Sequence, residues 1–234
     1  EKLVCFKAHP QAGAIYSDIY LTDNDGTILG KYYDGKKRPL PQGDIYTILL
    51  AGNFILQHGL LWKREALTHA GGFPKRSMLE DWECILRVAE SYPFYPLDQP
   101  LGYYRLHNQN ISKNFEEQIK GATETQLMVV ASRRFTSVPS SKRAAVLSKY
   151  GLKQWIDGDP NLGKQFLRMA FKADPYHPFP YLLSMLMIFN RSGGRFLVHN
   201  AWYLRSVLSR RFSSRDYFMQ QSHLFPRKDL KAHE

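Results

Sequence analysis

Residues 77–90, SMLEDWECILRVAE, decide the fold of this chain. Apolar side chains recur in this stretch at the spacing of one helix face: Leu79, Trp82, Ile85, Leu86 and Ala89. Charged side chains take the opposite face, and Glu83 can pair with Arg87 one turn later. The stretch therefore predicts an amphipathic helix. Ser77 and Glu80 have the spacing of a capping box, in which each side chain bonds the backbone amide of the other residue.

Asp81 has no local role in this pattern. It lies one turn into the predicted helix, off the apolar stripe and after the flexible residues 71–74. A carboxylate in that place can point into a cleft and accept a proton from a bound hydroxyl group. The alternative is a structural role, because an acidic side chain near a helix N-terminus interacts favourably with the helix dipole.

The composition limits the class of protein. The chain has 234 residues, 44% of them hydrophobic and 14% aromatic, which is enough for one ample core or two small ones. Cys5 and Cys84 have neither metal-site spacing nor a disulfide framework, so we expect a reducing, cytoplasmic compartment and a buried thiol at Cys84. The longest apolar run, residues 181–189, is too short to span a bilayer, and no signal segment opens the sequence.

Charge divides the chain into two regions. Residues 1–114 carry 13 Lys and Arg against 12 Asp and Glu, whereas residues 115–234 carry 19 against 9. Such an asymmetry predicts two regions with different partners. We place the boundary near residues 113–115.

The first region alternates short β-rich runs with helical ones, which is typical of an α/β sheet. Residues 14–21 and 27–33 are β-rich and flank the turn residues 24–26, so we expect a hairpin there. The other elements expected in this region are helices over residues 3–8, 45–51 and 63–67, a β-rich run over 54–62, and two short strands over 97–101 and 102–107.

The second region, residues 115–234, is predicted to be all-α with a basic surface. The expected helices cover residues 115–134, 142–157, 161–173, 181–189 and 196–208. Residues 213–234 are expected to form a loosely ordered tail.

The small residues and proline of this region resemble the spacing of one tetratricopeptide repeat: Gly151, Gly163, Ala170 and Pro175. Tyr150 and Gln154 depart from that repeat pattern. A plain helical hairpin that packs on the first region explains the same spacing equally well.

The last two predicted helices raise the question of a membrane. They are flanked by arginines, namely Arg191, Arg195, Arg205, Arg210, Arg211 and Arg215. Basic residues around Phe196, Trp202 and Leu208 are typical of helices that lie on an anionic membrane surface. The alternative is that these helices pack on their own domain. Nucleic acid is not expected as a partner, because the arginines belong to no recognisable binding module.

Five groups of residues follow one another along residues 1–114. They are Tyr16-Ser17-Asp18 with Asn24-Asp25-Gly26; Lys63-Arg64 with Ala70-Gly71-Gly72-Phe73; Glu80-Asp81-Trp82 with Leu86-Arg87; Leu101 with Tyr104-Arg105-Leu106-His107; and Asn110-x-Ser112. In order and spacing they resemble the C-terminal half of family 2 glycosyltransferases. The resemblance implies a partial GT-A, Rossmann-like sheet that lacks its N-terminal nucleotide-binding strands and is followed by the helical region.

The same resemblance implies an inverting glycosyltransferase. Asp81 would inherit the role of catalytic base, which deprotonates the acceptor hydroxyl as that oxygen displaces the nucleotide diphosphate. The implied partners are a nucleotide-sugar donor and a saccharide or lipid-linked acceptor, used in polysaccharide or glycan synthesis. An acceptor of this kind would suit a cytoplasmic enzyme that is peripheral at the inner face of the membrane.

Four more residues are candidates for substrate binding, each with a structural alternative. Glu80 completes the capping box described above, and Asn53 is either a turn amide after Gly52 or part of the acceptor pocket. Arg105 and His107 alternate on a predicted strand and therefore share a face. They contact either a phosphate or metal at the cleft, or only the edge of the sheet.

The family also holds a divalent cation, Mg²⁺ or Mn²⁺, through an Asp-x-Asp motif. No residue of this chain matches it, because Asp23-x-Asp25 lies in the predicted hairpin, after the strand. We therefore expect no metal ligands here, a donor-binding half upstream of Glu1, and no turnover by this fragment alone. The alternative function is a non-catalytic helical interaction or membrane-surface module derived from a transferase remnant.

Overall fold

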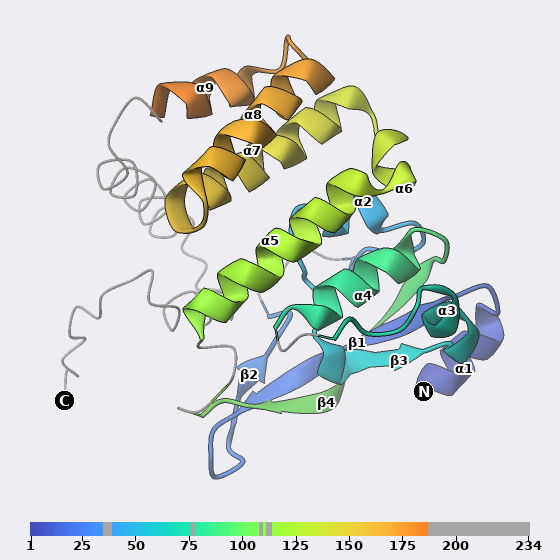
Figure 1. Ribbon diagram of the computed structural model, residues 1–234. Coiled ribbons are helices and arrows are strands. Elements are labelled where there is room, and N and C mark those ends of the chain that lie inside the picture. Colours follow the sequence, from blue (N-terminus) through green and yellow to red (C-terminus); the bar gives the residue numbers. More distant parts are fainter. Residues whose placement is uncertain (35–38, 76–77, 108–109, 111–113, 187–234) are drawn as a thin grey trace, which may run out of the picture.

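The computed structural model describes residues 1–34, 39–75, 78–107, 110 and 114–186 (Figure 1). Within these residues, four strands form an open, mixed sheet, and most of the helices lie over one of its faces. The predicted α/β class is therefore confirmed at this level. The predicted helix over residues 196–208, the flanking arginines, the tail over 213–234 and the end of the helix over 181–189 lie outside the described residues.

The strand β1 (Ala14–Thr22) is the centre of the sheet, because each of the other three strands pairs with it. The strands β2 (Ile28–Lys31) and β3 (Leu60–Trp62) run antiparallel to it, at its end and its beginning respectively. The strand β4 (Phe94–Arg105) runs parallel to it along its full length. Eight of the nine residues of β1 are buried, as expected of a strand in the interior of a sheet.

Three strand predictions are tested by this topology. The hairpin is confirmed by the antiparallel pairing of β1 with β2. The β-rich run over residues 54–62 forms a strand only in β3, after the 3-10 turn η1 (Gln57–Gly59). The two strands predicted over residues 97–107 are wrong, because β4 is one strand. Its prolines do not break it, since the ladder with β1 continues past them through shifts in register.

The helices are α1 (Lys2–Ala8), α2 (Tyr46–Leu49), α3 (Arg64–His69), α4 (Glu80–Ala89), α5 (Phe115–Ala131), α6 (Arg133–Thr136), α7 (Ser140–Asp157), α8 (Pro160–Ala173) and α9 (Pro178–Leu186). The single helix predicted over residues 115–134 is wrong. It is interrupted at Ser132, whose hydroxyl oxygen accepts the backbone N–H of Arg134 and starts α6. A serine with this bond acts as an N-cap and begins a new helix.

The central helix α4 has the amphipathic character predicted for it. It buries Trp82, Ile85 and Leu86 among other side chains, while Glu83 and Arg87 form an ion pair at 3.4 Å. The predicted capping box is not seen at its start. Ser77 lies outside the described residues, and Glu80 is the first helical residue rather than the third.

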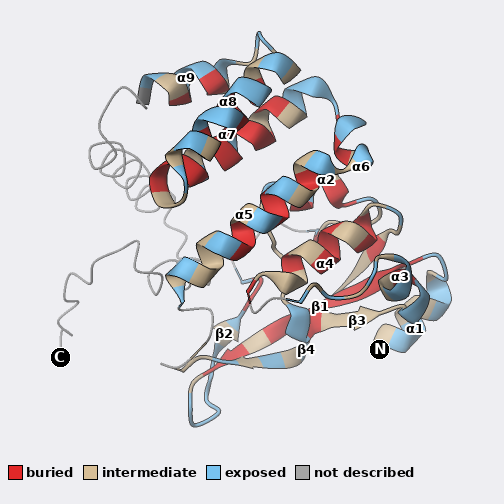
Figure 2. Cartoon of the chain, viewed as in Figure 1, coloured by how far each residue is buried: buried red, intermediate tan, exposed pale blue. Residues whose placement is uncertain are grey.

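One hydrophobic core joins the sheet to the helices that follow it. Figure 2 shows buried residues along α4, α5 and α7, on the faces that point toward the interior. The hydroxyl of Tyr150 on α7 donates a hydrogen bond of 2.8 Å to the carbonyl oxygen of Leu50, just after α2. Both residues are buried, so this bond ties the helical region to the sheet region.

The helices α7 and α8 form a tight hairpin. Any side chain at Gly163 would lie 2.8 Å from the carbonyl oxygen of Gly151, so the two backbones approach directly. Gln154 donates hydrogen bonds of 2.8 Å to Thr123 and Gln126 on α5. Tyr150 and Gln154, which depart from the repeat pattern, thus bind other parts of this chain. The hydrogen bond of Tyr150 reaches the first region, whereas those of Gln154 stay within the second.

Replacing Tyr150 by Phe tests the link between the two regions. The variant leaves the buried Leu50 carbonyl without its donor, so we expect the free energy of unfolding to fall by about 1–3 kcal/mol. Guanidinium denaturation measures it. The control is Tyr181→Phe, whose hydroxyl bonds Pro175 from an exposed position and should change stability by less than about 0.5 kcal/mol. Equal effects would contradict a special role for Tyr150.

The two cysteines should differ in reactivity. Burial raises the pKa of the Cys84 thiol to about 11, and Cys84 is fully buried in α4, whereas Cys5 on α1 is only partly buried. Because the thiolate is the reactive form, iodoacetamide at pH 8 should modify Cys5 and leave Cys84 intact in the folded protein. Mass spectrometry of the peptides checks this. In guanidinium both should react; equal rates without guanidinium would contradict the packing of α4.

Candidate functional site

Asp81 lies in the first turn of α4 with its side chain partly exposed. One carboxylate oxygen, Oδ1, accepts the backbone N–H of Trp82 at 2.6 Å. The other, Oδ2, accepts the side-chain amide of Asn53 at 3.3 Å. Each oxygen therefore has a donor that holds its direction, and the structure brings together two residues that are 28 positions apart in the sequence.

Asn53 is held in a fixed orientation by its own loop. Gly52 before it has a φ of 143°, a value that favours glycine. The side-chain oxygen Oδ1 of Asn53 accepts the backbone N–H of Ile55 at 3.0 Å. This bond leaves the nitrogen Nδ2 to face Asp81. Asn53 thus acts as a turn amide that also contacts Asp81, and its place in an acceptor pocket stays a prediction.

Trp82 helps to hold Asn53 and Asp81 in place. Its side chain is buried, as predicted for a core residue, and its indole nitrogen donates a hydrogen bond of 3.0 Å to the carbonyl oxygen of Leu49 in α2. The bond joins the start of α4 to the end of α2, and Asn53 follows α2 by only a few residues. The distance between Asn53 and Asp81 is therefore fixed by the packing of two helices.

The turn that leads into α4 has an unusual backbone. Leu79 has a φ of 56°, the only described residue other than glycine with a positive φ. The helix α5 crosses at this point, and a side chain at Gly121 would lie 2.4 Å from the carbonyl oxygen of Met78. Backbone strain of this kind is frequent at functional sites, where the surrounding structure maintains it. Here α5 fixes the turn that precedes Asp81.

Glu80 lies next to Asp81 as the first residue of α4, partly exposed. Three acidic residues, Glu80, Asp81 and Glu83, therefore fall in the first turn of this helix, where the dipole favours negative charge. The structural explanation of Glu80 is thus a dipole contact at the helix start.

Arg105 and His107 belong to a second group of contacts, at the end of β4. Arg105 is the last residue of the strand and is exposed. The side chain of Asn110 accepts the backbone N–H of His107 at 2.6 Å and donates to the carbonyl oxygen of Arg105 at 3.1 Å. The prediction that Arg105 and His107 alternate on one strand is wrong, because β4 ends before His107 and the chain turns around Asn110.

One residue of this neighbourhood was missed by the sequence analysis. His58, in η1, places its ring edge-on to that of Tyr104 in β4, with 4.8 Å between the ring centroids. Burial lowers the pKa of His58, so its imidazole is neutral at pH 7. Gly102 in β4 makes the approach possible, since a side chain there would lie 2.7 Å from the carbonyl oxygen of His58. No local signal connects these residues, because they are distant in sequence.

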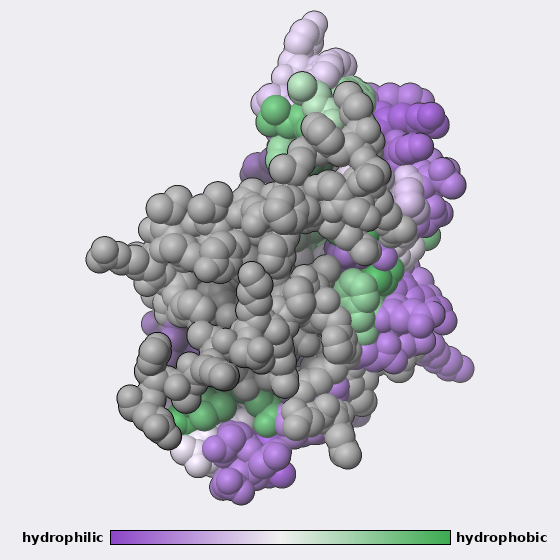
Figure 3. Space-filling model, turned by 90° about the vertical axis from the view of Figure 1, so that its left-hand side faces the viewer, coloured by the Kyte–Doolittle hydropathy of each residue, from purple (hydrophilic) through white to green (hydrophobic). Residues whose placement is uncertain are grey.

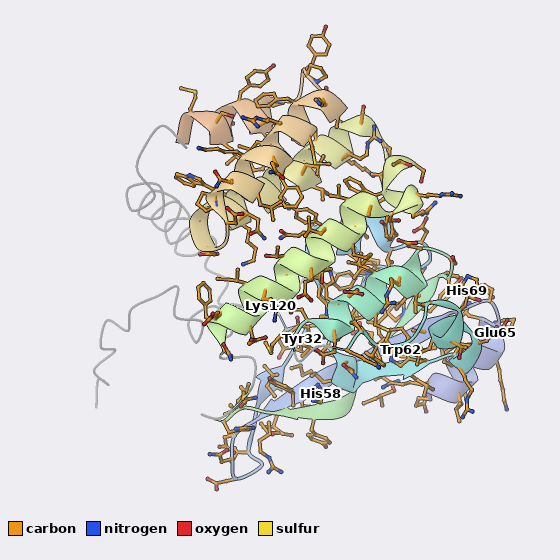
Figure 4. The ribbon with its side chains drawn as sticks, in the orientation of Figure 1. Tyr32, His58, Trp62, Glu65, His69 and Lys120 are labelled. Carbon is orange, nitrogen blue, oxygen red and sulfur yellow. The ribbon has the colours of Figure 1, made fainter. Side chains whose placement is uncertain are left out.

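The direction in which α4 runs determines on which side of the sheet its first turn lies. In Figure 1 the helix α4 begins on the side of the molecule where β1 and β4 end. Figure 4 shows Tyr32, His58 and Lys120 on that same side, contributed by the loop after β2, by η1 and by α5. The first turn of α4 and the carboxyl ends of the parallel strands thus face one side of the molecule.

Comparison with models of known protein families gives no match to this sequence, and comparison with curated proteins gives none. Within the described residues, no three His, Cys, Asp or Glu side chains are grouped as a metal site requires. No helix in this same part of the chain is both long and apolar enough to cross a bilayer.

Replacing Gly121 by Ala tests the support of the turn before Asp81. The added methyl group would collide with the Met78 carbonyl oxygen, so either α5 or the turn must move. We expect a loss of about 1–3 kcal/mol in the free energy of unfolding. Thermal or guanidinium denaturation measures it. Lys120→Ala, an exposed neighbour on α5, is the control and should be nearly neutral; a neutral Gly121→Ala would contradict the close crossing.

Proposed function

We propose that this chain carries the acceptor side of an inverting family 2 glycosyltransferase, with Asp81 as the catalytic base. The observation that carries the proposal is the carboxylate of Asp81, partly exposed at the start of α4 and oriented by Asn53. The five groups of residues that resemble the family supply the reaction class. The finer fold, a partial Rossmann-like GT-A sheet, is part of the same proposal.

The position of Asp81 supports this function. In open α/β sheets, ligands bind outside the carboxyl ends of the parallel strands. The helix α4 precedes β4 and begins on the side where β1 and β4 end, so Asp81 lies on that side. A carboxylate there is near the place where a substrate would bind, whereas one at the other end of α4 would not be.

The chemistry assigned to Asp81 is one proton transfer. A carboxylate oxygen accepts the proton of an acceptor hydroxyl while that oxygen forms a bond to the anomeric carbon of the donor sugar. The bond from that carbon to the nucleoside diphosphate breaks at the same time, and its electron pair leaves with the diphosphate. The Asn53 amide keeps the carboxylate in its direction before the proton arrives.

Glu80, Asn53, Arg105 and His107 are proposed to contact the substrates. Arg105 is exposed at the end of the parallel strand pair, where a guanidinium can bind an anionic group of the donor. In the family a divalent cation, Mg²⁺ or Mn²⁺, neutralises the diphosphate. The described residues do not supply a group of ligands that fits such an ion, so no step is assigned to it here.

The test separates the proposed proton transfer to Asp81 from the hydrogen bond that Asp81 accepts from Asn53. In Asp81→Asn an amide faces the Asn53 amide, so we expect both a modest loss of stability and a fall in turnover of about 10²–10⁴-fold. The double variant Asn53→Asp with Asp81→Asn restores an amide–carboxylate pair. It should recover stability without recovering turnover.

The measurement is release of nucleoside diphosphate from a panel of nucleotide sugars, with saccharide and lipid-linked acceptors. The variants are placed in the native gene, and the protein is purified from its natural source. Recovered turnover in the double variant would assign Asp81 a structural role only. Turnover unchanged in Asp81→Asn would favour the alternative, a non-catalytic helical module derived from a transferase.

A further inference from the structure

The outer side of α9 carries an exposed apolar face. Its members are Pro178, Tyr181, Leu182 and Met185. Their spacing of three and four residues places them on one side of the helix. Leu182 and Met185 are 56% and 63% exposed, whereas Leu183 on the opposite side is 3% exposed and packs inward. The helix has no charged residue, so its outer surface is apolar without interruption.

The neighbouring helix α8 carries a stripe of positive charge. This basic stripe consists of Lys164, Arg168 and Lys172, which are four residues apart and all exposed. No acidic residue lies within α8. Asp174, just after the helix, accepts the backbone N–H of Tyr176 at 3.0 Å. Residues 161–186 thus hold three Lys and Arg side chains against one Asp and no Glu.

The two surfaces are adjacent. The ring of Tyr181 on α9 packs edge-on against Phe171 of α8 at 4.7 Å, and its hydroxyl donates to the carbonyl oxygen of Pro175 at 2.7 Å. Phe171 directly precedes Lys172 in α8. Tyr176, in the connection between the helices, is 94% exposed. Figure 3 looks onto the side where α9 lies and shows apolar side chains at its upper end, beside strongly hydrophilic ones.

We propose that α8 and α9 together form a docking surface for an anionic lipid bilayer. The outward apolar face of α9 can contact the apolar interior of a bilayer. The lysines and the arginine of α8 can then pair with the negatively charged headgroups above it. Tyr176 and Tyr181 are amphipathic aromatic side chains of the kind that prefers this interface. An acidic protein would satisfy the basic stripe but would leave the apolar face in water.

The charge of residues 115–234 agrees with this partner. They carry the excess of basic residues, and residues 1–114 are nearly neutral. A membrane that attracts positive charge would therefore bind the molecule on the side of the second region. The binding does not depend on the proposed transferase activity, so either proposal can fail without the other.

The experiment is co-sedimentation of the full 234-residue chain with vesicles. We expect binding to vesicles of phosphatidylcholine with 30% phosphatidylserine, weak binding to pure phosphatidylcholine, and a loss of affinity at high salt. Lys164→Gln with Arg168→Gln and Lys172→Gln should lower the affinity for the anionic vesicles on the order of 100-fold, about five-fold per charge.

Two matched controls separate this surface from net charge and from general hydrophobicity. Lys31→Gln with Lys75→Gln and Lys120→Gln removes the same charge from exposed positions elsewhere and should change the affinity little. Leu182→Ser with Met185→Ser should lower the affinity roughly 10-fold or more. Leu3→Ser with Val4→Ser, at exposed positions on α1, should not.

Three outcomes would overturn the proposal. The first is an equal loss of vesicle binding in the two triple glutamine variants, which would show attraction by net charge alone. The second is equal binding to neutral vesicles. The third is a dimer in light scattering that Leu182→Ser with Met185→Ser dissociates, with no vesicle binding, since the apolar face would then belong to a contact between two copies of this chain.

Discussion

The rest of the structure depends on the hydrogen-bonded pairing of β1 with three other strands. Since β1 is paired along both edges, every described strand is positioned through it. The carboxylate of Asp18, buried in β1, accepts the backbone N–H groups of Ile19 and Tyr33, which fixes the chain after the hairpin. The direction of β4 then fixes the direction of α4, because α4 leads into that strand. The position of Asp81 is thus a consequence of strand pairing.

The candidate site is built from segments that have little in common in the sequence. A loop after α2 supplies Asn53, and the start of α4 supplies Asp81. Gly121 of α5 packs against the turn that leads into α4. The helical region therefore contributes to the geometry of the site without giving it a reactive group. This explains why a glycine without chemistry of its own lies at the crossing.

The sequence predicted what depends on local pattern. The periodicity of residues 77–90 was enough to place α4, and the turn residues 24–26 were enough to place the hairpin. It failed where tertiary contacts decide the outcome. Two short strands were expected over residues 97–107, but pairing with β1 keeps β4 continuous and leaves His107 beyond its end. The contacts of Asn53 with Asp81 and of His58 with Tyr104 join distant segments, and no spacing rule encodes them.

The hydrogen bond from Tyr150 to Leu50 closes a loop of 100 residues and has a consequence for synthesis of the chain. The ribosome releases the sheet region first, yet the buried carbonyl of Leu50 finds its donor only after Tyr150 has left the exit tunnel. Contacts between residues so far apart in sequence slow folding. Until Tyr150 arrives, the carbonyl oxygen of Leu50, just after α2, stays open to solvent, and the incomplete core is open to chaperones. The nascent chain therefore reaches its stable state late, when α7 is complete.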